Sequence, residues 1–140
     1  MELTKLLETK TPDLTIRVDF KGFELELAYI DKPGLEALVG RAKTRTWDRK
    51  HQMAETIDEK KLVRGLATLI KGWHGLSLGH LATLLPIDII DRDADAPVSF
   101  SAENAAVLIA QVYGLDDFII DTVTDLQIFR AEKMETEKKN

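Results

Sequence analysis

Hydrophobic and polar residues alternate along the first organised segment of the chain. Apolar side chains occupy every second position on both sides of Lys21-Gly22, namely Leu14, Ile16, Val18, Phe20, Phe23, Leu25, Leu27 and Tyr29. A period of two is typical of a strand with one buried face, and Gly22 can take the positive φ that a two-residue turn needs. The pattern predicts a β-hairpin over residues 14–30. Because an isolated hairpin is marginal in water, its apolar face must pack on the rest of the chain.

The hydrophobic period becomes helical after the hairpin. Pro33 suits the first turn of a helix, so we expect a short helix there and an exposed connection that continues to Gln52. The strongest helical pattern covers residues 56–73, where Thr56 and Glu59 have the spacing of a capping box. Its apolar stripe consists of Leu62, Leu66, Leu69, Ile70 and Trp73. A shorter helix is expected over 76–86, ended by Pro86.

Two further helices follow an acidic loop. Ser101 is a suitable N-cap, Glu103 lies in the first turn where negative charge is favourable, and Gly114 is a natural stop. We expect the last helix to begin near Asp116. Its apolar positions are Phe118, Ile119, Val123, Leu126 and Phe129.

These elements predict one α+β domain that is mostly α. Residues 14–133 form it, with the hairpin at 14–30 and a body of four to five helices at 33–133. Residues 1–13 form an N-terminal segment, and residues 134–140 form a charged tail that we expect to be frayed. The 140 residues are 44% hydrophobic, which is enough for one ordinary core.

Composition narrows the function classes. The formal net charge of −5 argues against a protein that wraps nucleic acid, and we interpret the short basic run at 41–51 as a solvated helix face or linker. The absence of cysteine excludes disulfides, thiolate metal sites and cysteine nucleophiles. Residues 1–13 do not resemble a signal peptide, and no apolar stretch is long enough to span a bilayer. We therefore expect a cytoplasmic protein with neither a nucleic-acid nor a membrane partner.

The acidic loop at 91–104 partly matches an EF-hand. Asp91, Asp93 and Asp95 fill the first three ligand positions, and Val98 fits the apolar eighth position. The required glycine and the bidentate glutamate are missing, because the corresponding residues are Ala96 and Ala102, with Pro97 between them and Glu103 one place late. We interpret the segment as a turn leading into a helix. A small calcium-binding or hydrolytic domain stays as a minor alternative.

No constellation of catalytic residues is visible. The three histidines, His51, His74 and His80, lack metal-ligand spacing. Asp116 and Asp117 occupy a predicted helix start, where the helix dipole accounts for them. No phosphate loop, dinucleotide fingerprint or nucleophile elbow occurs. We predict a binding or assembly protein that is not an enzyme and uses no metal or cofactor.

Three segments together resemble a known family. "LIKGWHGL" at 69–76 precedes the acidic loop, "PVSFSAENAAVLI" follows at 97–109, and "GLDDFIIDTVTDLQIFRAEK" closes the chain at 114–133. In this order they resemble the tail assembly chaperones of long-tailed bacteriophages and prophages. The resemblance covers roughly residues 14 to 135. It departs from the family pattern at 76–90, where an additional helix separates the Trp-x-Gly step from the acidic loop.

The resemblance implies a chaperone in the bacterial host cytoplasm. It would bind the tape measure protein, the long helical protein that sets tail length, and keep it soluble until the tail tube protein encloses it. The alternative function is a virion-resident tail structural or completion protein. The outer edges of the hairpin could also pair with a second copy of the chain or with a tube subunit.

Two apolar sets are candidate partner contacts. They are Phe118, Ile119, Val123, Leu126 and Phe129 of the last helix, and Leu78, Leu81, Leu84 and Leu85. Ordinary core packing is the competing interpretation of both sets, and burial separates the two, because partner contacts should be partly exposed. Four other residues are expected to hold the fold: Trp73 against the final helices, Gly75 at a tight exit, Phe100 as a hydrophobic staple and Ser101 as the cap.

Overall fold

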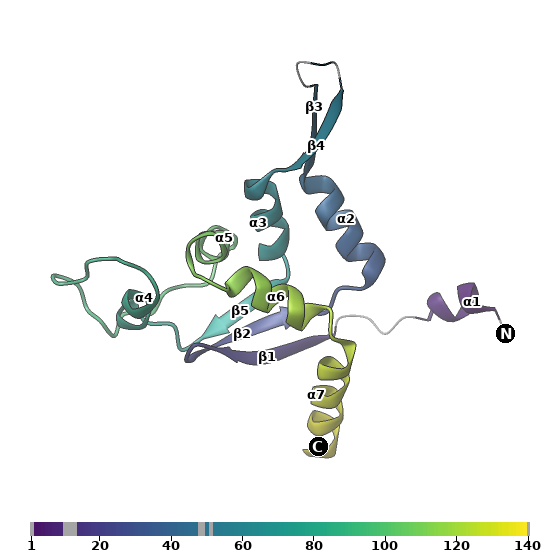
Figure 1. Cartoon of the computed structure of the whole chain (residues 1–140). Coiled ribbons are helices and arrows are strands. Elements are labelled where there is room, and N and C mark those ends of the chain that lie inside the picture. Colours follow the sequence, from purple (N-terminus) through teal and green to yellow (C-terminus); the bar gives the residue numbers. More distant parts are fainter. Residues whose placement is uncertain (1, 10–13, 48–49, 51, 140) are drawn as a thin grey trace.

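The computed structural model describes residues 2–9, 14–47, 50 and 52–139. Within them the chain is mixed α/β, with short helices and two small antiparallel sheets (Figure 1). The elements in chain order are α1 (Leu3–Leu7), β1 (Thr15–Phe20), β2 (Phe23–Ala28), α2 (Lys32–Ala42), β3 (Lys43–Trp47), β4 (Met53–Ile57), α3 (Glu59–Ala67), β5 (Ile70–His74), α4 (Leu78–Leu84), α5 (Ala102–Gln111), α6 (Leu115–Val123) and α7 (Leu126–Lys139).

The predicted hairpin is confirmed. β1 and β2 pair antiparallel, with Phe20 opposite Phe23. Lys21 and Gly22 both have positive φ, at 47° and 99°, as a two-residue hairpin turn of the right twist requires. The inward side chains are buried, whereas Thr15, Arg17 and Asp19 of β1 are exposed. The buried side chains of the hairpin are Ile16, Phe20, Phe23, Leu25 and Leu27.

The predicted helix over 56–73 is wrong at both ends. Helix α3 covers only Glu59–Ala67, and its N-cap is Asp58, whose carboxylate accepts hydrogen bonds from the N–H groups of Lys60 and Lys61. Thr56 belongs to β4. The end of the predicted helix is strand β5, which pairs antiparallel with β2 and gives a sheet of order β1-β2-β5. The central strand β2 is therefore hydrogen-bonded on both edges.

A bulge explains why β5 imitates a helix in the sequence. Gly72 pairs with Glu26 and Ile70 pairs with Leu27, so Lys71 is an extra residue without an opposite partner. The bulge puts Ile70 and Trp73 on the same, buried face although they are three residues apart. A spacing of three is helical in a sequence pattern, which is why periodicity alone assigned this strand to a helix.

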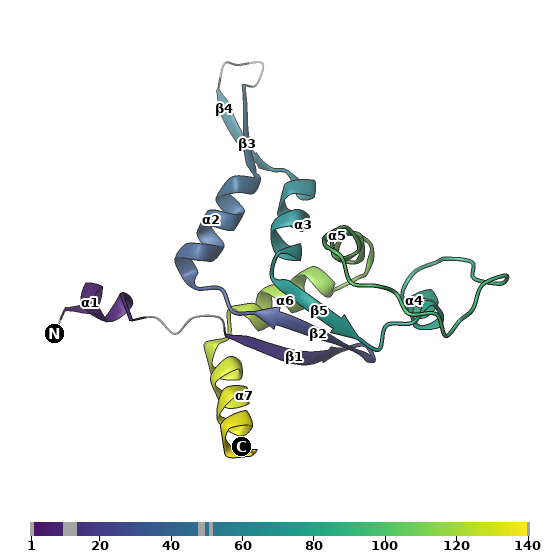
Figure 2. The same cartoon turned by 180° about the vertical axis from the view of Figure 1, so that it is seen from behind.

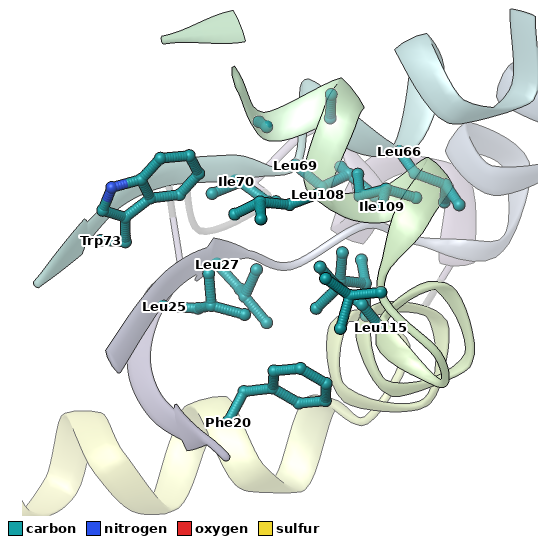
Figure 3. Close-up of a cluster of buried hydrophobic side chains, with 14 of the residues drawn as sticks. Phe20, Leu25, Leu27, Leu66, Leu69, Ile70, Trp73, Leu108, Ile109 and Leu115 are labelled. Atoms are coloured by element: carbon teal, nitrogen blue, oxygen red, sulfur yellow. The ribbon is translucent and has the colours of Figure 1, made fainter. Parts of the chain in front are cut away.

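Helices cover one face of the three-stranded sheet and form the core with it. Figure 3 shows Phe20, Leu25 and Leu27 turned toward side chains from the helices. The buried helical partners include Leu66 of α3, Leu108 and Ile109 of α5, and Leu115 and Ile119 of α6. Helix α7 packs against the end of the hairpin. Its Phe129 is buried, and the Phe129 ring lies 5.5 Å from that of Tyr29 between centroids.

The C-terminal helical region differs from the prediction. The expected last helix is two helices, α6 and α7, separated at Thr124 and Asp125. The Asp125 carboxylate accepts hydrogen bonds from the N–H groups of Gln127 and Ile128, and so begins a new helix. The expected frayed tail instead continues α7 to Lys139, and Asn140 lies outside the described residues.

The expected exposed connection up to Gln52 contains strand β3, which forms a second sheet with β4 just after it. Strands β3 and β4 form a two-stranded ribbon that projects from the ends of α2 and α3, away from the body, in both views (Figures 1 and 2). Its side chains are exposed on both faces, apart from a half-buried Thr44. Because polar residues occupy both faces, the ribbon has no alternation of apolar and polar positions by which the sequence could reveal it. Residues 48, 49 and 51 lie outside the described part.

We predict that Gly22→Ala destabilises the protein by about 1–3 kcal/mol. The residue has φ of 99°, and a Cβ added there would lie 2.7 Å from Cε1 of His80. Urea unfolding of the purified chain measures the change. Gly40→Ala is the matched control, because it lies in helix α2 and nothing stands within 4 Å of its Cβ position. It should be neutral or stabilising by up to about 1 kcal/mol. Equal midpoints for both variants would contradict the described turn.

Candidate functional site

The structure sorts the last-helix candidates by burial. Ile119 and Val123 are fully buried and Phe129 is 1% exposed, so these three side chains belong to the core. Phe118 is half-buried, with its ring 4.9 Å from that of Phe20 between centroids. Leu126 is half-buried at the start of α7. The set is split between two helices and forms no continuous exposed stripe.

The leucine candidates are half-buried. All four, Leu78, Leu81, Leu84 and Leu85, keep part of their surface exposed. Three of them, Leu81, Leu84 and Leu85, pack against the main core cluster. Helix α4 is therefore a satellite of the core, fixed at its start by Ser77, whose hydroxyl accepts a hydrogen bond from the His80 N–H at 3.1 Å.

The residues expected to hold the fold are brought together around Trp73. Its indole Nε1 donates a hydrogen bond of 2.8 Å to the Val98 carbonyl, and its ring meets Phe100 edge-on at 5.1 Å between centroids. Trp73 thus packs on the segment that precedes α5, and the expectation that it packs against the final helices needs this correction. Ser101 caps α5 as predicted, accepting from the Asn104 N–H at 3.0 Å. Gly75 has φ of 79°, a left-handed conformation that suits the exit from β5.

The acidic loop forms local turns. The Asp93 carboxylate accepts a hydrogen bond from the Asp95 N–H at 2.9 Å, and the carboxylates of Asp91, Asp93 and Asp95 are exposed. His74 is exposed on β5 and the His80 ring packs against Phe23, while His51 lies outside the described residues. Among residues 2–9, 14–47, 50 and 52–139, no three His, Asp or Glu side chains are placed to share one metal ion.

A groove that sequence analysis did not anticipate lies between helices α3, α5 and α6. It has a volume of about 550 Å³. Its apolar lining comes from Leu62, Val63, Leu66, Ala106, Val107, Ile109, Ala110 and Ile120. Charged and polar side chains of both signs complete it, namely Glu59, Lys60, Arg64, Gln111 and Asp116. The site is thus an open apolar trough with a mixed-charge lining.

The sequence of α5 accounts for the groove. One apolar face, with Ala105, Leu108 and Ile109, is buried in the core. A second apolar face consists of Ala106, Val107 and Ala110, and Val107 is 54% exposed. The small side chains of Ala106 and Ala110, four residues apart on one face, leave the trough open. A helix that is apolar on more than one face indicates a second contact surface, and this was the signal that could have located the site.

A second, wider cavity of about 1150 Å³ lies between α1, the end of the hairpin and α7. One of its sides consists of Leu6, Leu7 and Thr9, and all five residues of α1 are exposed. Its shape therefore depends on a single short helix. The α3–α5–α6 groove, by contrast, is built from helices that pack in the core, and it is the better candidate site.

No helix in the described part of the chain is both long and apolar enough to cross a membrane. The chain matches no protein-family model, no curated protein and no solved structure.

We predict a large loss of stability for an alanine substitution in the core and almost none for one in the groove. Ile119→Ala should lower the free energy of unfolding by about 2–5 kcal/mol, because it leaves a cavity in the core. Val107→Ala should change it by no more than about 0.5 kcal/mol, because that side chain is half exposed. Denaturant unfolding followed by circular dichroism measures both. A large loss of stability for Val107→Ala would show that other parts of the native protein cover the Val107 side chain, and that the groove is therefore not open.

Proposed function

We propose that this chain is a tail assembly chaperone of a long-tailed bacteriophage or prophage, which binds the tape measure protein and keeps it soluble during tail assembly. The three segments at 69–76, 97–109 and 114–133 support the family. The observation that carries the proposal is the open apolar groove between α3, α5 and α6. A chaperone for a long helical client needs an exposed apolar surface shaped for a helix. It must also bind the client weakly enough to release it.

The groove fits an amphipathic helix. Such a helix binds by laying its apolar face into a trough, with anchors three and four residues apart. Client side chains would pass over the small Ala106 and Ala110 and pack against Val63, Val107 and Ile120. This contact would cover apolar stripes of the client that otherwise promote aggregation.

The charged lining supplies orientation and reversibility. Lys60 and Arg64 stand on α3, and Asp116 stands at the start of α6, so the groove offers partners for both signs of charge on the client. All three side chains are exposed, and exposed ion pairs contribute only about 0–1 kcal/mol each. Binding would therefore depend on modest apolar burial and no covalent step. Tail tube subunits could then displace the chaperone.

The alternative function is a virion-resident tail structural or completion protein. The projecting β3–β4 ribbon favours it, because the ribbon is an exposed arm of the kind that assembly proteins place against neighbours. The two functions differ in the finished particle. A chaperone is absent from mature virions, whereas a completion protein remains in them.

The test is co-expression with the longest helical protein encoded beside this chain, followed by affinity purification. We expect that protein to be soluble only with this partner and to co-elute with it. Val107→Glu should reduce the co-eluted amount at least about tenfold, because it places a charge in the apolar trough. Tyr113→Glu is the matched control, since Tyr113 is 91% exposed and lies outside the groove, and it should co-elute normally.

Two results would count against the chaperone. One is a neighbouring protein that is soluble alone and does not co-elute. The other is this chain detected by mass spectrometry as a stoichiometric component of purified particles, which would support the virion-resident function. Normal co-elution of the Val107→Glu variant would place the client contact away from the groove.

A further inference from the structure

The chain exposes more surface than a compact monomer of its size. Its accessible area is 10278 Å², whereas a compact 15.8 kDa protein is expected to expose about 7300 Å². The excess exceeds the roughly 800 Å² that each partner contributes to a standard protein–protein interface. The projecting segments of Figures 1 and 2 show where this area arises: α1, the β3–β4 ribbon, the loop after α4, and α7.

The ribbon has two unlike faces. One face carries the large side chains in directly opposed pairs: Lys43 with Ile57, Arg45 with Glu55, and Trp47 with Met53. The other carries only Thr44, Thr46, Ala54 and Thr56. On the large face Trp47 is 68% exposed and Met53 is 51% exposed. A two-stranded ribbon is marginal in water by itself, so the exposed Trp47 and Met53 on this partly charged face indicate a covering partner.

Charge identifies the kind of partner. Residues 41–57, which are the end of α2 and the ribbon with its turn, hold five Lys and Arg against two Asp and Glu, although the whole chain has a net charge of −5. On the large face itself, Lys43 and Arg45 stand against Glu55. A partner that covers this face should therefore combine apolar side chains with acidic ones. Two ribbons packed on each other would bring the basic surplus of one segment against that of the other, and like-charge repulsion disfavours that arrangement.

The loop after α4 has the complementary chemistry. Residues 87–95 hold four aspartates and one arginine. They also expose apolar side chains, with Ile90 86% exposed and Ile87 39% exposed. The loop is fastened to the body, because the Leu78 and Gly79 N–H groups donate to the Ala96 and Ala94 carbonyls, each at 2.8 Å. The loop is thus held at its C-terminal end and presents an acidic and apolar surface.

We propose that the β3–β4 ribbon of one copy of this chain docks on the acidic loop at 87–95 of a second copy. In both views the ribbon and the loop project from different sides of the body, so the contact joins two molecules (Figures 1 and 2). Trp47 and Met53 pack against Ile87 and Ile90, and the basic side chains of the ribbon face the loop aspartates. The contact is head-to-tail, and repetition of it produces a ring or an open chain of subunits. This contact between two copies does not depend on which client the protein binds.

The first experiment measures the mass of the purified full chain against concentration. Light scattering from about 1 μM to about 200 μM should give a mass that rises above that of the monomer. The rise should weaken between about 0.05 M and 0.5 M salt, because exposed charges are then screened. Trp47→Ser should weaken association at least about tenfold. Tyr113→Ser, another exposed aromatic outside both surfaces, should leave it unchanged.

The second experiment reverses charge on each surface separately. The ribbon variant combines Lys43→Glu on β3 with Arg41→Glu in the last turn of α2, which leads into the ribbon, and it leaves the Arg45–Glu55 ion pair intact. The loop variant is Asp91→Lys with Asp95→Lys. Each variant alone should be monomeric, because its ribbon and its loop carry the same sign of charge. An equimolar mixture should associate again, because each surface then meets its opposite. Circular dichroism of each variant confirms that the fold is retained.

Three results would overturn the proposal. The first is a monomer mass at every concentration. The second is association that Trp47→Ser and both charge variants leave unchanged, since the contact would then lie elsewhere. The third is a mixture that stays monomeric although each variant is folded, because complementation is required when ribbon and loop meet directly.

Discussion

Strand β2 is the element on which the rest of the structure depends. It is hydrogen-bonded to β1 on one edge and to β5 on the other, and Leu25 and Leu27 on its inner face are fully buried. Both leucines belong to one buried cluster with side chains of α3, α5 and α6, so the helices that form the groove share their core with the sheet. Strand β5 also brings Trp73 to the segment before α5, where its indole donates to the Val98 carbonyl. One central strand therefore fixes both the core and the position of the α5 helix.

Single helices of this protein contribute side chains both to the core and to the groove. Helix α5 buries Leu108 and Ile109 and leaves Val107 half exposed beside them. Core and groove are thus one residue apart on the same helix. The candidates Ile119 and Val123 of α6 and Phe129 of α7 belong to the core, because their own side chains are buried. Binding by such a groove and cohesion of the core are separable by mutation, because different faces of α5 serve each.

The elements that the sequence predicted well have strong local signals. The hairpin has uninterrupted alternation and a Lys-Gly turn, and Ser101 is a standard cap at the start of α5. The errors have physical causes. The bulge at Lys71 gave β5 a helical spacing, and the polar faces of β3 and β4 concealed the ribbon. Asp125 restarts a helix within an apolar stripe that continues across the break. The second apolar face of α5 was a sequence signal for a contact surface, but the groove itself depends on how three helices pack, which no local pattern encodes.

The projecting ribbon and loop affect how the chain moves through water. A molecule with arms on different sides of its body has a larger frictional coefficient than a sphere of equal mass. Its elution volume on a sizing column would therefore correspond to that of a larger globular protein even when it is a single subunit. The elution volume of a single subunit would therefore resemble that of a dimer. A method that measures the mass of the particle, such as light scattering or sedimentation equilibrium, separates shape from association.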